Sequence, residues 1–576
     1  LVNNQTYTVS FWYTPRSVSA LTVRLSGSLL VSAPDSSPSG IRTRLDSEDV
    51  RANLADLRAW HCSRAVGARG QLMEVLLQFF ENHFVTQHSK TQDYLDRYYD
   101  GSVLDRLATA MEYRENSRWR AALSNPNCTF YDLLEISAES PAMIIYLDTV
   151  GSRGDGTRIA NENYARELFE LFCMGVDNGY DQNDIVAMSR AWTGWTVDIQ
   201  APADVDNPFA PRSSQYGVYP GSGFNAVSNL FGVWTHSFDS TWHGTNRARI
   251  LSVWSPTSPP GNPVAIGPKV YPARFGAPWA GQSYQLIIPP RTGNAGMQDG
   301  YDVIRHLADL AFTAEYLSVK LSRLFIHEDF EHGVYDYTDP NRSAEAELIR
   351  QCIVAWNTPA SDGRKGNIRS VLRTIFASEL FRSHGGSLQK VKTPLEFVAS
   401  SVRALRSVNL DGTATANTDG YSFSSILGRM GAMSLFNRAD PDGYPEAGAP
   451  WISAGTLAER LRFVQSYLTA ASTTGRPSDA GQNVSDPVAL LKKKLPAISW
   501  RNAPAVTEYF LRTLFPGEGT ANLDLYRRLA INFLNTADDG ITASAFSALT
   551  DTSTAYDTRV RGMVSLLMTT QRFQEQ

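Results

Sequence analysis

Cysteine is scarce in this chain, and its scarcity argues against two kinds of stabilising centre. The 576 residues include four cysteines, at positions 62, 128, 173 and 352. Such wide spacing does not build the disulfide framework of small secreted domains, and no CxxC pair offers the usual zinc ligands. Cys173 lies within a strongly apolar segment, so we expect it to be a buried apolar residue.

Long apolar runs and a strong charge of either sign are also missing. No segment approaches the roughly eighteen uninterrupted apolar residues of a transmembrane helix, so none is predicted. The net charge of −5 is small for this length. Non-specific nucleic-acid binding needs a concentrated basic face, so nucleic acid is not an expected partner.

The familiar catalytic motifs are absent as well. The chain has no P-loop, no GxGxxG after a strand, no GxSxG elbow and no HExxH helix. It also has no internal repeat of fixed period. These absences exclude the simplest nucleotide-binding and hydrolase functions.

What the chain does contain is ample material for a helical core. It is 43% hydrophobic and 19% charged, an ordinary globular balance. Apolar residues recur at helical spacing from residue 41 onward. We therefore predict a mostly α fold, with one large multi-helix domain over residues 41–576. Helices are expected at 54–66, 70–84, 105–120, 129–137, 161–175, 301–330, 344–356, 367–381, 394–407, 456–471, 486–495, 503–514, 523–534 and 560–570.

Two segments depart from this helical pattern. Residues 6–32 alternate apolar and polar side chains, which predicts a small N-terminal β segment, a hairpin within residues 1–35. A lone hairpin is not stable, and the chain starts at Leu1, so we expect a remnant of an upstream β-sandwich module in a larger secreted multidomain protein.

Residues 198–300 are rich in proline, glycine and aromatics, which predicts a loop-rich aromatic insertion. A loop of this length is either functional or carries short strands of its own.

Residues 161–195 look like the centre of the fold, as two helices joined by a tight turn. Asn161 is a good N-cap for the first helix, and Gly175 stops it. Asp181 caps the second helix, with Asp184 in a capping-box position. The first helix is apolar almost all round, so we expect it to be the most buried helix of the domain.

This apolar helix nevertheless carries carboxylates. Asn163, Glu167 and Glu170 fall on one flank, and a buried carboxylate must find a cation, a metal ion or several donors. One interpretation is a structural network in which Arg166 reaches Glu170 and another arginine reaches Glu167. The other is a functional site in which Glu167 and Glu170 are the catalytic candidates. Buried ion pairs are more often structural, which favours the first interpretation.

The same stretch carries a family resemblance. The letters NENYAREL, followed by a glycine turn and a second helix ending in TGW, resemble the signature of an exported bacterial family called domain of unknown function eighteen-hundred. Glu81 stands where that family usually has histidine. The resemblance implies export and a mostly helical fold but no established activity. It covers roughly residues 41–576, with further matching segments, in the family's order, at 81–89, 141–152, 306–326, 391–405 and 435–453.

Two histidines extend the functional hypothesis to a metal. His83 ends an apolar helix, and His243 lies in a segment where the resemblance places a family histidine. With Glu167 and Glu170 they would suit zinc, manganese or iron, with an open position for water. The alternative is that His83 is a satisfied core histidine and the carboxylates meet arginine.

The aromatic residues leave two alternatives open. Exposed rings could stack on the apolar C–H faces of sugars, or they could pack on the helices under a long loop, which we favour. The candidate binding residues are Asn163, Arg166, Trp195 and Trp242.

The sequence therefore predicts an exported module. Its expected location is the cell surface, the extracellular space or the periplasm. We expect an assembly or binding role with a protein or polysaccharide partner. The alternative is an extracellular enzyme, polysaccharide-directed or metal-dependent, that uses the carboxylates of the central helix. Glycoside chemistry would need those carboxylates about 5–10 Å apart across an open cleft.

Overall fold

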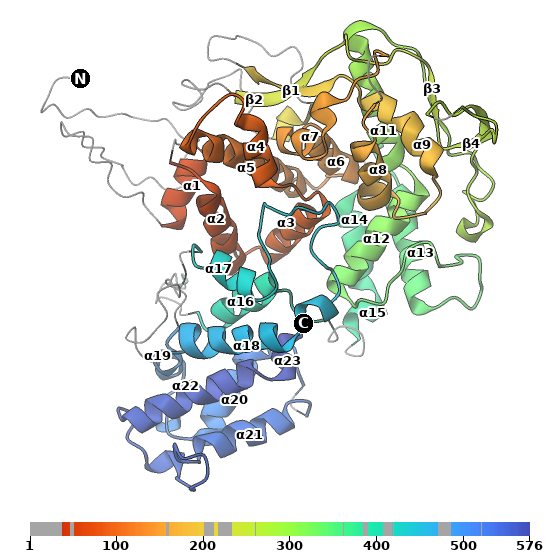
Figure 1. Ribbon diagram of the computed structural model, residues 1–576. Helices are drawn as coiled ribbons and strands as arrows, with labels where there is room; N and C mark the ends of the chain where they lie inside the picture. The colour runs from red at the N-terminus through yellow and green to blue at the C-terminus, as the bar shows by residue number, and fades with distance from the viewer. Residues whose placement is uncertain are drawn as a thin grey trace, which may run out of the picture.

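Helices dominate the computed structural model, which confirms the predicted mostly α fold class (Figure 1). The N-terminal β segment predicted within residues 1–35 lies outside the described residues. The structure describes residues 37–46, 51–156, 160–200, 212–216, 233–259, 261–360, 362–383, 390–406, 418, 420–470, 485–519 and 521–575.

Local capping chemistry starts three of the helices in the first half of the chain, α2, α6 and α9. Asn53 caps α2, and its side chain accepts from the backbone of Asp56, which closes a capping box. Asp181 and Asp184 form the predicted capping box at the start of α9. The helices of this half are α1 (Pro38–Asp46), α2 (Leu54–Gly67), α3 (Gln71–His83), α4 (His88–Leu95), α5 (Ser102–Ser124), α6 (Phe130–Ala138), α7 (Pro141–Tyr146), η1 (Thr149–Gly151), α8 (Asn163–Glu167), η2 (Leu168–Cys173), α9 (Gln182–Ser189) and η3 (Arg190–Trp192).

The aromatic insertion carries short strands, one of the two outcomes that its length predicts. Three two-stranded antiparallel sheets form within its described part: β1 (Trp195–Gln200) with β2 (Val233–Phe238), β3 (Ala248–Ile250) with β6 (Leu286–Ile288), and β4 (Ser252–Trp254) with β5 (Ala265–Pro268). Trp234 and Tyr284 are buried, and Trp254 and Trp279 pack against the helices. These rings therefore anchor the insertion, as favoured above. Its short helical turns are η4 (Arg212–Tyr216), η5 (Ala273–Phe275) and η6 (Gly293–Met297).

The second half returns to helices. The long helical segment predicted at 301–330 is divided in two, because the chain leaves the helix between Ala308 and Ala311. The helices are α11 (Gln298–Ala308), α12 (Ala311–Phe325), α13 (Ala344–Asn357), α14 (Ile368–Ala377), α15 (Glu379–Arg382), α16 (Pro394–Ala404), α17 (Phe423–Arg429), η7 (Ala449–Trp451), α18 (Ala454–Arg462), η8 (Phe463–Leu468), α19 (Pro487–Lys494), η10 (Ala497–Ser499), α20 (Ala503–Leu514), α21 (Asp524–Leu534), η11 (Phe546–Ala548), α22 (Thr554–Met568) and α23 (Gln571–Gln574).

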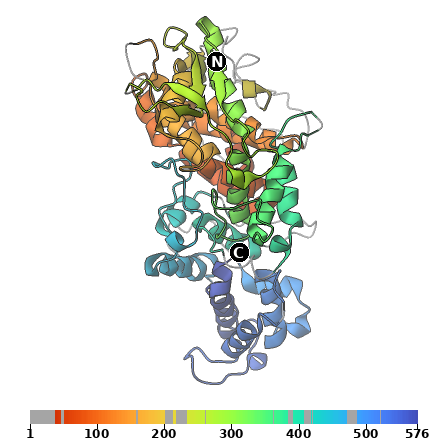
Figure 2. The same ribbon diagram turned by 90° about the vertical axis from the view of Figure 1, so that its right-hand side faces the viewer.

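Two large hydrophobic cores organise these helices. The first core draws its buried side chains from residues 76–375. The second core combines α1 and α2 with residues 395–573, so helices from the two ends of the chain share one interior. The C-terminal helices α18–α22 extend from the rest of the molecule and form one end of its elongated shape (Figures 1 and 2).

The central helix is not the most buried helix, contrary to the prediction: every residue of α6 is buried, whereas Asn163 is exposed and Arg166 and Glu167 are half-buried, because one flank of the central helix faces solvent. It is also not one continuous α-helix. After Glu167 the chain continues as the π-helix η2, where the Phe169 carbonyl accepts from Met174 N (2.8 Å) and Gly175 N (3.1 Å). The wider turn changes the angular spacing of the side chains, and Phe169, Phe172 and Cys173 are all completely buried. Such π-turns occur frequently at functional sites.

Gly175 ends this helix for two physical reasons. Its φ of 87° lies in the left-handed region that favours glycine. A Cβ at this position would also lie 2.5 Å from His332 Nε2 and 2.9 Å from the ring of Tyr316 on α12. The glycine therefore allows the central helix to pack closely against α12.

Glu315 on α12 joins the insertion to the first core. The carboxylate is completely buried and accepts from both guanidinium nitrogens of Arg274 (2.6 and 2.8 Å) and from the Tyr337 hydroxyl (2.6 Å). Arg274 also donates to Asn178, in the turn after the central helix (3.2 Å). Three distant segments therefore meet at one buried ion pair.

We predict that Arg274→Ala lowers the free energy of unfolding by about 3–5 kcal/mol, because it leaves Glu315 buried without its cation. Urea unfolding followed by circular dichroism measures the change. The control is Arg382→Ala, which removes an exposed ion pair with Glu379 and should cost less than about 1 kcal/mol. Equal losses in the two variants would contradict the role given to Arg274.

Candidate functional site

The carboxylates of the central helix lie at a partly exposed surface. Arg166 pairs with Glu170 (3.2 Å), as the structural interpretation predicts, and also donates to Gln182 (2.8 Å). Asn163 donates to the Asp148 carboxylate (3.2 Å). The side chain of Glu170 is 24% exposed, so this flank of the helix is not sealed in the core.

Glu167 is a residue of this surface whose pKa is raised. Its side chain is half-buried, and burial raises the pKa of the Glu167 carboxyl group to about 7. Glu170 and Asp442 raise this pKa further, while Arg166 opposes them. Asp442 belongs to the segment 435–453, so two segments that carry the family resemblance meet here.

His83 is a core histidine. Its Nε2 donates to the Phe172 carbonyl (3.0 Å), one of the last carbonyls of η2, which the helix itself leaves without a donor. The ring packs among aromatic side chains, with Phe84 at 4.6 Å between centroids and Phe79 stacked at 5.9 Å. Burial and the nearby Lys320 hold the pKa of His83 well below its usual value, so the imidazole is neutral.

His243 has a different set of partners. Its Nδ1 donates to the Thr193 carbonyl (2.8 Å), and its Nε2 faces the Asp299 carboxylate (3.2 Å). Arg291 pairs with the same carboxylate. Thr193 lies just before the aromatic insertion and Asp299 near its end, so His243 links the segments where the insertion begins and ends.

The structure does not bring His83, Glu167, Glu170 and His243 together as the proposed metal site. Within the described ranges, no three His, Cys, Asp or Glu side chains are arranged to hold a metal ion. The physical reason is that each histidine finds a nearer partner. His83 meets a free helix carbonyl, and His243 meets an acidic residue that the sequence analysis did not consider.

The two candidate tryptophans have different environments. Trp195 is completely buried and packs against Trp192 and Tyr301. It is therefore a core residue and not a binding surface. Trp242 is half-buried, with the Arg153 guanidinium 3.8 Å from its ring centroid.

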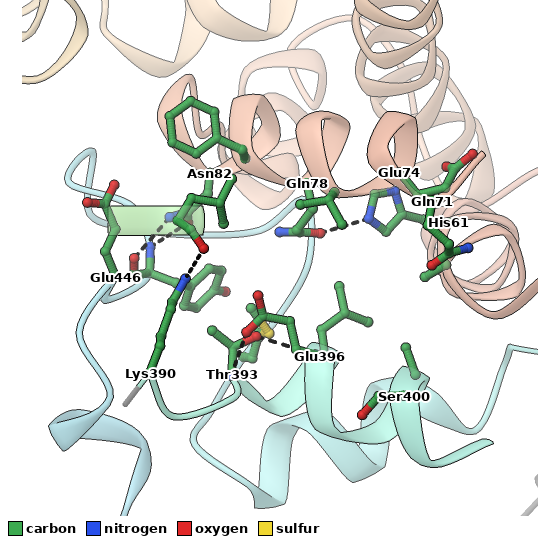
Figure 3. A pocket seen from close by; sticks show the side chains of 18 of the residues that line it. His61, Gln71, Glu74, Gln78, Asn82, Lys390, Thr393, Glu396, Ser400 and Glu446 are labelled. Atoms are coloured by element: carbon green, nitrogen blue, oxygen red, sulfur yellow. Dashed lines mark hydrogen bonds between the residues drawn. The ribbon is translucent and has the colours of Figure 1, made fainter. Parts of the chain in front are cut away.

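A pocket of about 240 Å³ opens between the two cores, which we call the interlobe pocket (Figure 3). One wall is α3, where Gln78 and Asn82 face Thr393, Glu396 and Ser400 of the opposite wall. Apolar side chains supply much of the lining, including Ala65, Val75, Phe79, Leu324, Leu395, Ala399, Met433 and Pro445.

Lys320, Glu446 and Glu74 of the interlobe pocket are ion-paired within the protein, while Lys390, Glu396 and Arg403 of the lining hydrogen-bond backbone groups. Lys320 pairs with Glu446 (2.9 Å). Burial alone would lower the pKa of Lys320, but Glu446 and Tyr316 together outweigh it and raise that pKa above its ordinary value. Glu74 pairs with Arg64 (3.0 Å) and Arg120 (2.8 Å). A charged ligand would have to compete with these internal pairs.

His61 adds a neutral hydrogen-bonding group to the lining. Burial lowers the pKa of His61 to about 4, so the imidazole is uncharged at neutral pH. Its Nε2 bonds the Gln78 side-chain carbonyl (2.7 Å). The other ring nitrogen, Nδ1, is buried and has no hydrogen-bond partner among the described residues.

The interlobe pocket was not predicted from the sequence, although the chain carries a signal for it. Four segments with the family resemblance outside the signature, 81–89, 306–326, 391–405 and 435–453, each contribute lining residues. Examples are Asn82, Lys320, Ser400 and Tyr444. Their convergence could have been suspected from the resemblance, but their spatial order was not readable from the chain.

One comparison with known proteins gives a match. The family model described as "Protein of unknown function (DUF1800)" matches residues 11–226 and 245–575, so its match begins inside the segment 1–35. No curated protein and no solved structure matches the chain. No helix in the described part of the chain is long and apolar enough to cross a membrane.

We predict that Glu167 makes stability depend on pH. Its folded-state pKa of about 7 exceeds the ordinary value of 4.5, so the protonated form stabilises the fold at low pH. That contribution is lost as pH rises through about 7. Glu167→Gln stays neutral, so it should be more stable than the wild type at about pH 8, by on the order of 1 kcal/mol, with little difference near pH 4.5.

Urea unfolding of both proteins at the two pH values measures this difference. Glu379→Gln is the control, because that side chain is 87% exposed and should show no comparable pH-dependent gain. A Glu167→Gln effect that is the same at both pH values would refute the raised pKa.

Proposed function

The chain belongs to the DUF1800 family, and from this premise we propose that it is a binding module whose ligand enters the interlobe pocket. One observation carries the proposal. Segments that resemble the family and lie far apart in the sequence supply the walls of one cavity. Small-molecule sites are typically concave, largely apolar and placed between structural units.

The lining indicates a small, neutral and mostly apolar ligand. The ion pairs Lys320–Glu446 and Glu74–Arg120 are complete without a ligand. Breaking a buried ion pair is costly, so a charged ligand gains little here. His61 and Gln78 remain as neutral polar groups that can orient a hydrogen-bonding group of the ligand.

We further propose that this module is exported and acts at the cell surface or outside the cell, in assembly or binding. The support is the family resemblance of its sequence segments. Labelling of intact host cells with a membrane-impermeant reagent tests this part, since a protein that is labelled only after lysis is not at the surface.

A second candidate function is an extracellular enzyme that uses Glu167. The observation that favours it is the pKa of about 7, which suits a proton donor at neutral pH. Against it, Glu170 is paired with Arg166 instead of facing a substrate. Release of reducing ends from polysaccharides by the wild type but not by Glu167→Gln would favour this enzyme.

We predict that N-phenyl-1-naphthylamine, a neutral and mostly apolar fluorescent probe, binds the wild type saturably at one site. Ser400→Phe should weaken this binding at least about tenfold, equivalent to about 1.4 kcal/mol, because the ring fills the pocket. Fluorescence titration measures the affinity, and circular dichroism checks that the variant is folded.

Ser425→Phe is the matched control. Both serines lie in helices and donate to the carbonyl three residues earlier at 3.2 Å, but Ser425 is exposed and does not line the pocket. Its probe binding should equal that of the wild type. If both variants bind the probe equally, the interlobe pocket is not the binding site.

A further inference from the structure

A second concave surface lies beside the β1–β2 sheet, away from the interface between the two cores. We call it the tyrosine groove. It has a volume of about 620 Å³ and shares no residue with the interlobe pocket. It lies where the β1–β2 sheet meets the end of α4. Its lining includes Tyr94, Arg97, Tyr98, Asp198, Asp239 and Trp242.

The aromatic side of the groove is exposed yet held in place. Tyr98 is 56% exposed, which is unusual for a large ring. Its ring rests on the buried Trp234 (5.1 Å between centroids) and on Tyr94 (6.0 Å). An exposed ring that neighbouring rings already support loses little conformational freedom when a ligand binds.

Trp242 supplies a second ring to the lining. The Arg153 guanidinium lies 3.8 Å from its centroid and fixes the indole. The backbone carbonyl of Trp242 also accepts from Gly154 N (2.7 Å), so the loop beneath the ring is tied to the helical body. The groove therefore presents two supported aromatic rings, Tyr98 and Trp242.

Polar groups accompany these rings. Asp198 is exposed and accepts at Oδ1 from its neighbour Ile199 N (2.7 Å). Asp239 accepts at Oδ1 from both the backbone and the hydroxyl of Thr241 (2.9 and 2.6 Å). The hydrogen bonds recorded for the described residues leave the second oxygen of each carboxylate available. Arg97 is exposed beside them and adds donors.

We propose that the tyrosine groove binds a neutral polysaccharide. Aromatic rings stack on the apolar C–H faces of sugar rings, and carboxylate and guanidinium groups hydrogen-bond their hydroxyls. Arg97 in the lining and Arg153 on the Trp242 ring are balanced by Asp198 and Asp239, so the groove has no excess positive charge to attract phosphate or uronate polymers, which carry negative charge. Tyr98, Arg97 and Asp198 are exposed, so a long chain can reach them from solvent.

This inference rests on the proposed function as a binding module and gives it a ligand class at a separate surface. Affinity electrophoresis of the full chain tests it, in gels that contain mannan, xylan, soluble β-glucan or the polyanion alginate. We expect retardation by at least one of the neutral polymers and none by alginate. Tyr98→Ala and Trp242→Ala should each weaken the interaction about tenfold.

Three further variants sharpen the result. Tyr98→Phe keeps the ring and should keep most of the binding. Ile498→Ala removes an apolar side chain that is 91% exposed elsewhere and should change nothing. Ser400→Phe alters the interlobe pocket and should leave polysaccharide binding intact. Circular dichroism establishes that each variant is folded.

The opposing outcomes are equally definite. The groove is not a polysaccharide site if no neutral polymer retards the wild type, if alginate retards it as strongly, or if Tyr98→Ala and Trp242→Ala migrate as the wild type does. Loss of retardation in Ser400→Phe alone would move the polymer to the interlobe pocket, which overturns this inference while the proposed binding function stands.

Discussion

Buried charge on α12 is the constraint on which the rest of the structure depends. Glu315 and Lys320 lie in the interior, where an unpaired charge costs several kcal/mol. Each is therefore paired by a residue from a distant segment, Arg274 for the glutamate and Glu446 for the lysine. The first pair fixes the aromatic insertion to the first core, and the second holds a wall of the interlobe pocket.

The signature stretch, residues 161–195, contributes to the interior around α12 mainly by close packing. Gly175 lets the central helix approach Tyr316 on α12, and Phe172 offers the carbonyl that His83 needs. At Gly300, on α11, an added Cβ would lie 2.5 Å from the ring of Trp195, so that contact also requires glycine. The stretch that resembles a family signature therefore acts largely through packing. At its surface, Glu167 has a raised pKa.

The two concave surfaces differ in what forms them. The interlobe pocket arises where two separately packed cores meet, so ion pairs such as Lys320–Glu446 join distant segments in its walls and apolar side chains supply much of its lining. The tyrosine groove arises beside a two-stranded sheet, and exposed polar groups surround its rings. This difference in surroundings is why we infer a small apolar ligand for the first and a neutral polymer for the second.

The sequence by itself determined the local structure. Helical periodicity predicted a mostly α fold, and capping residues predicted the Asp181–Asp184 box and the stop at Gly175, because these signals act over a few residues. It also predicted the Arg166–Glu170 pair, which lies within one helical turn. Only the tertiary structure decided the partners of His83 and His243 and the walls of the interlobe pocket. Those contacts join residues such as His83 and Phe172, 89 positions apart, and a local pattern does not encode which distant group lies nearest after folding.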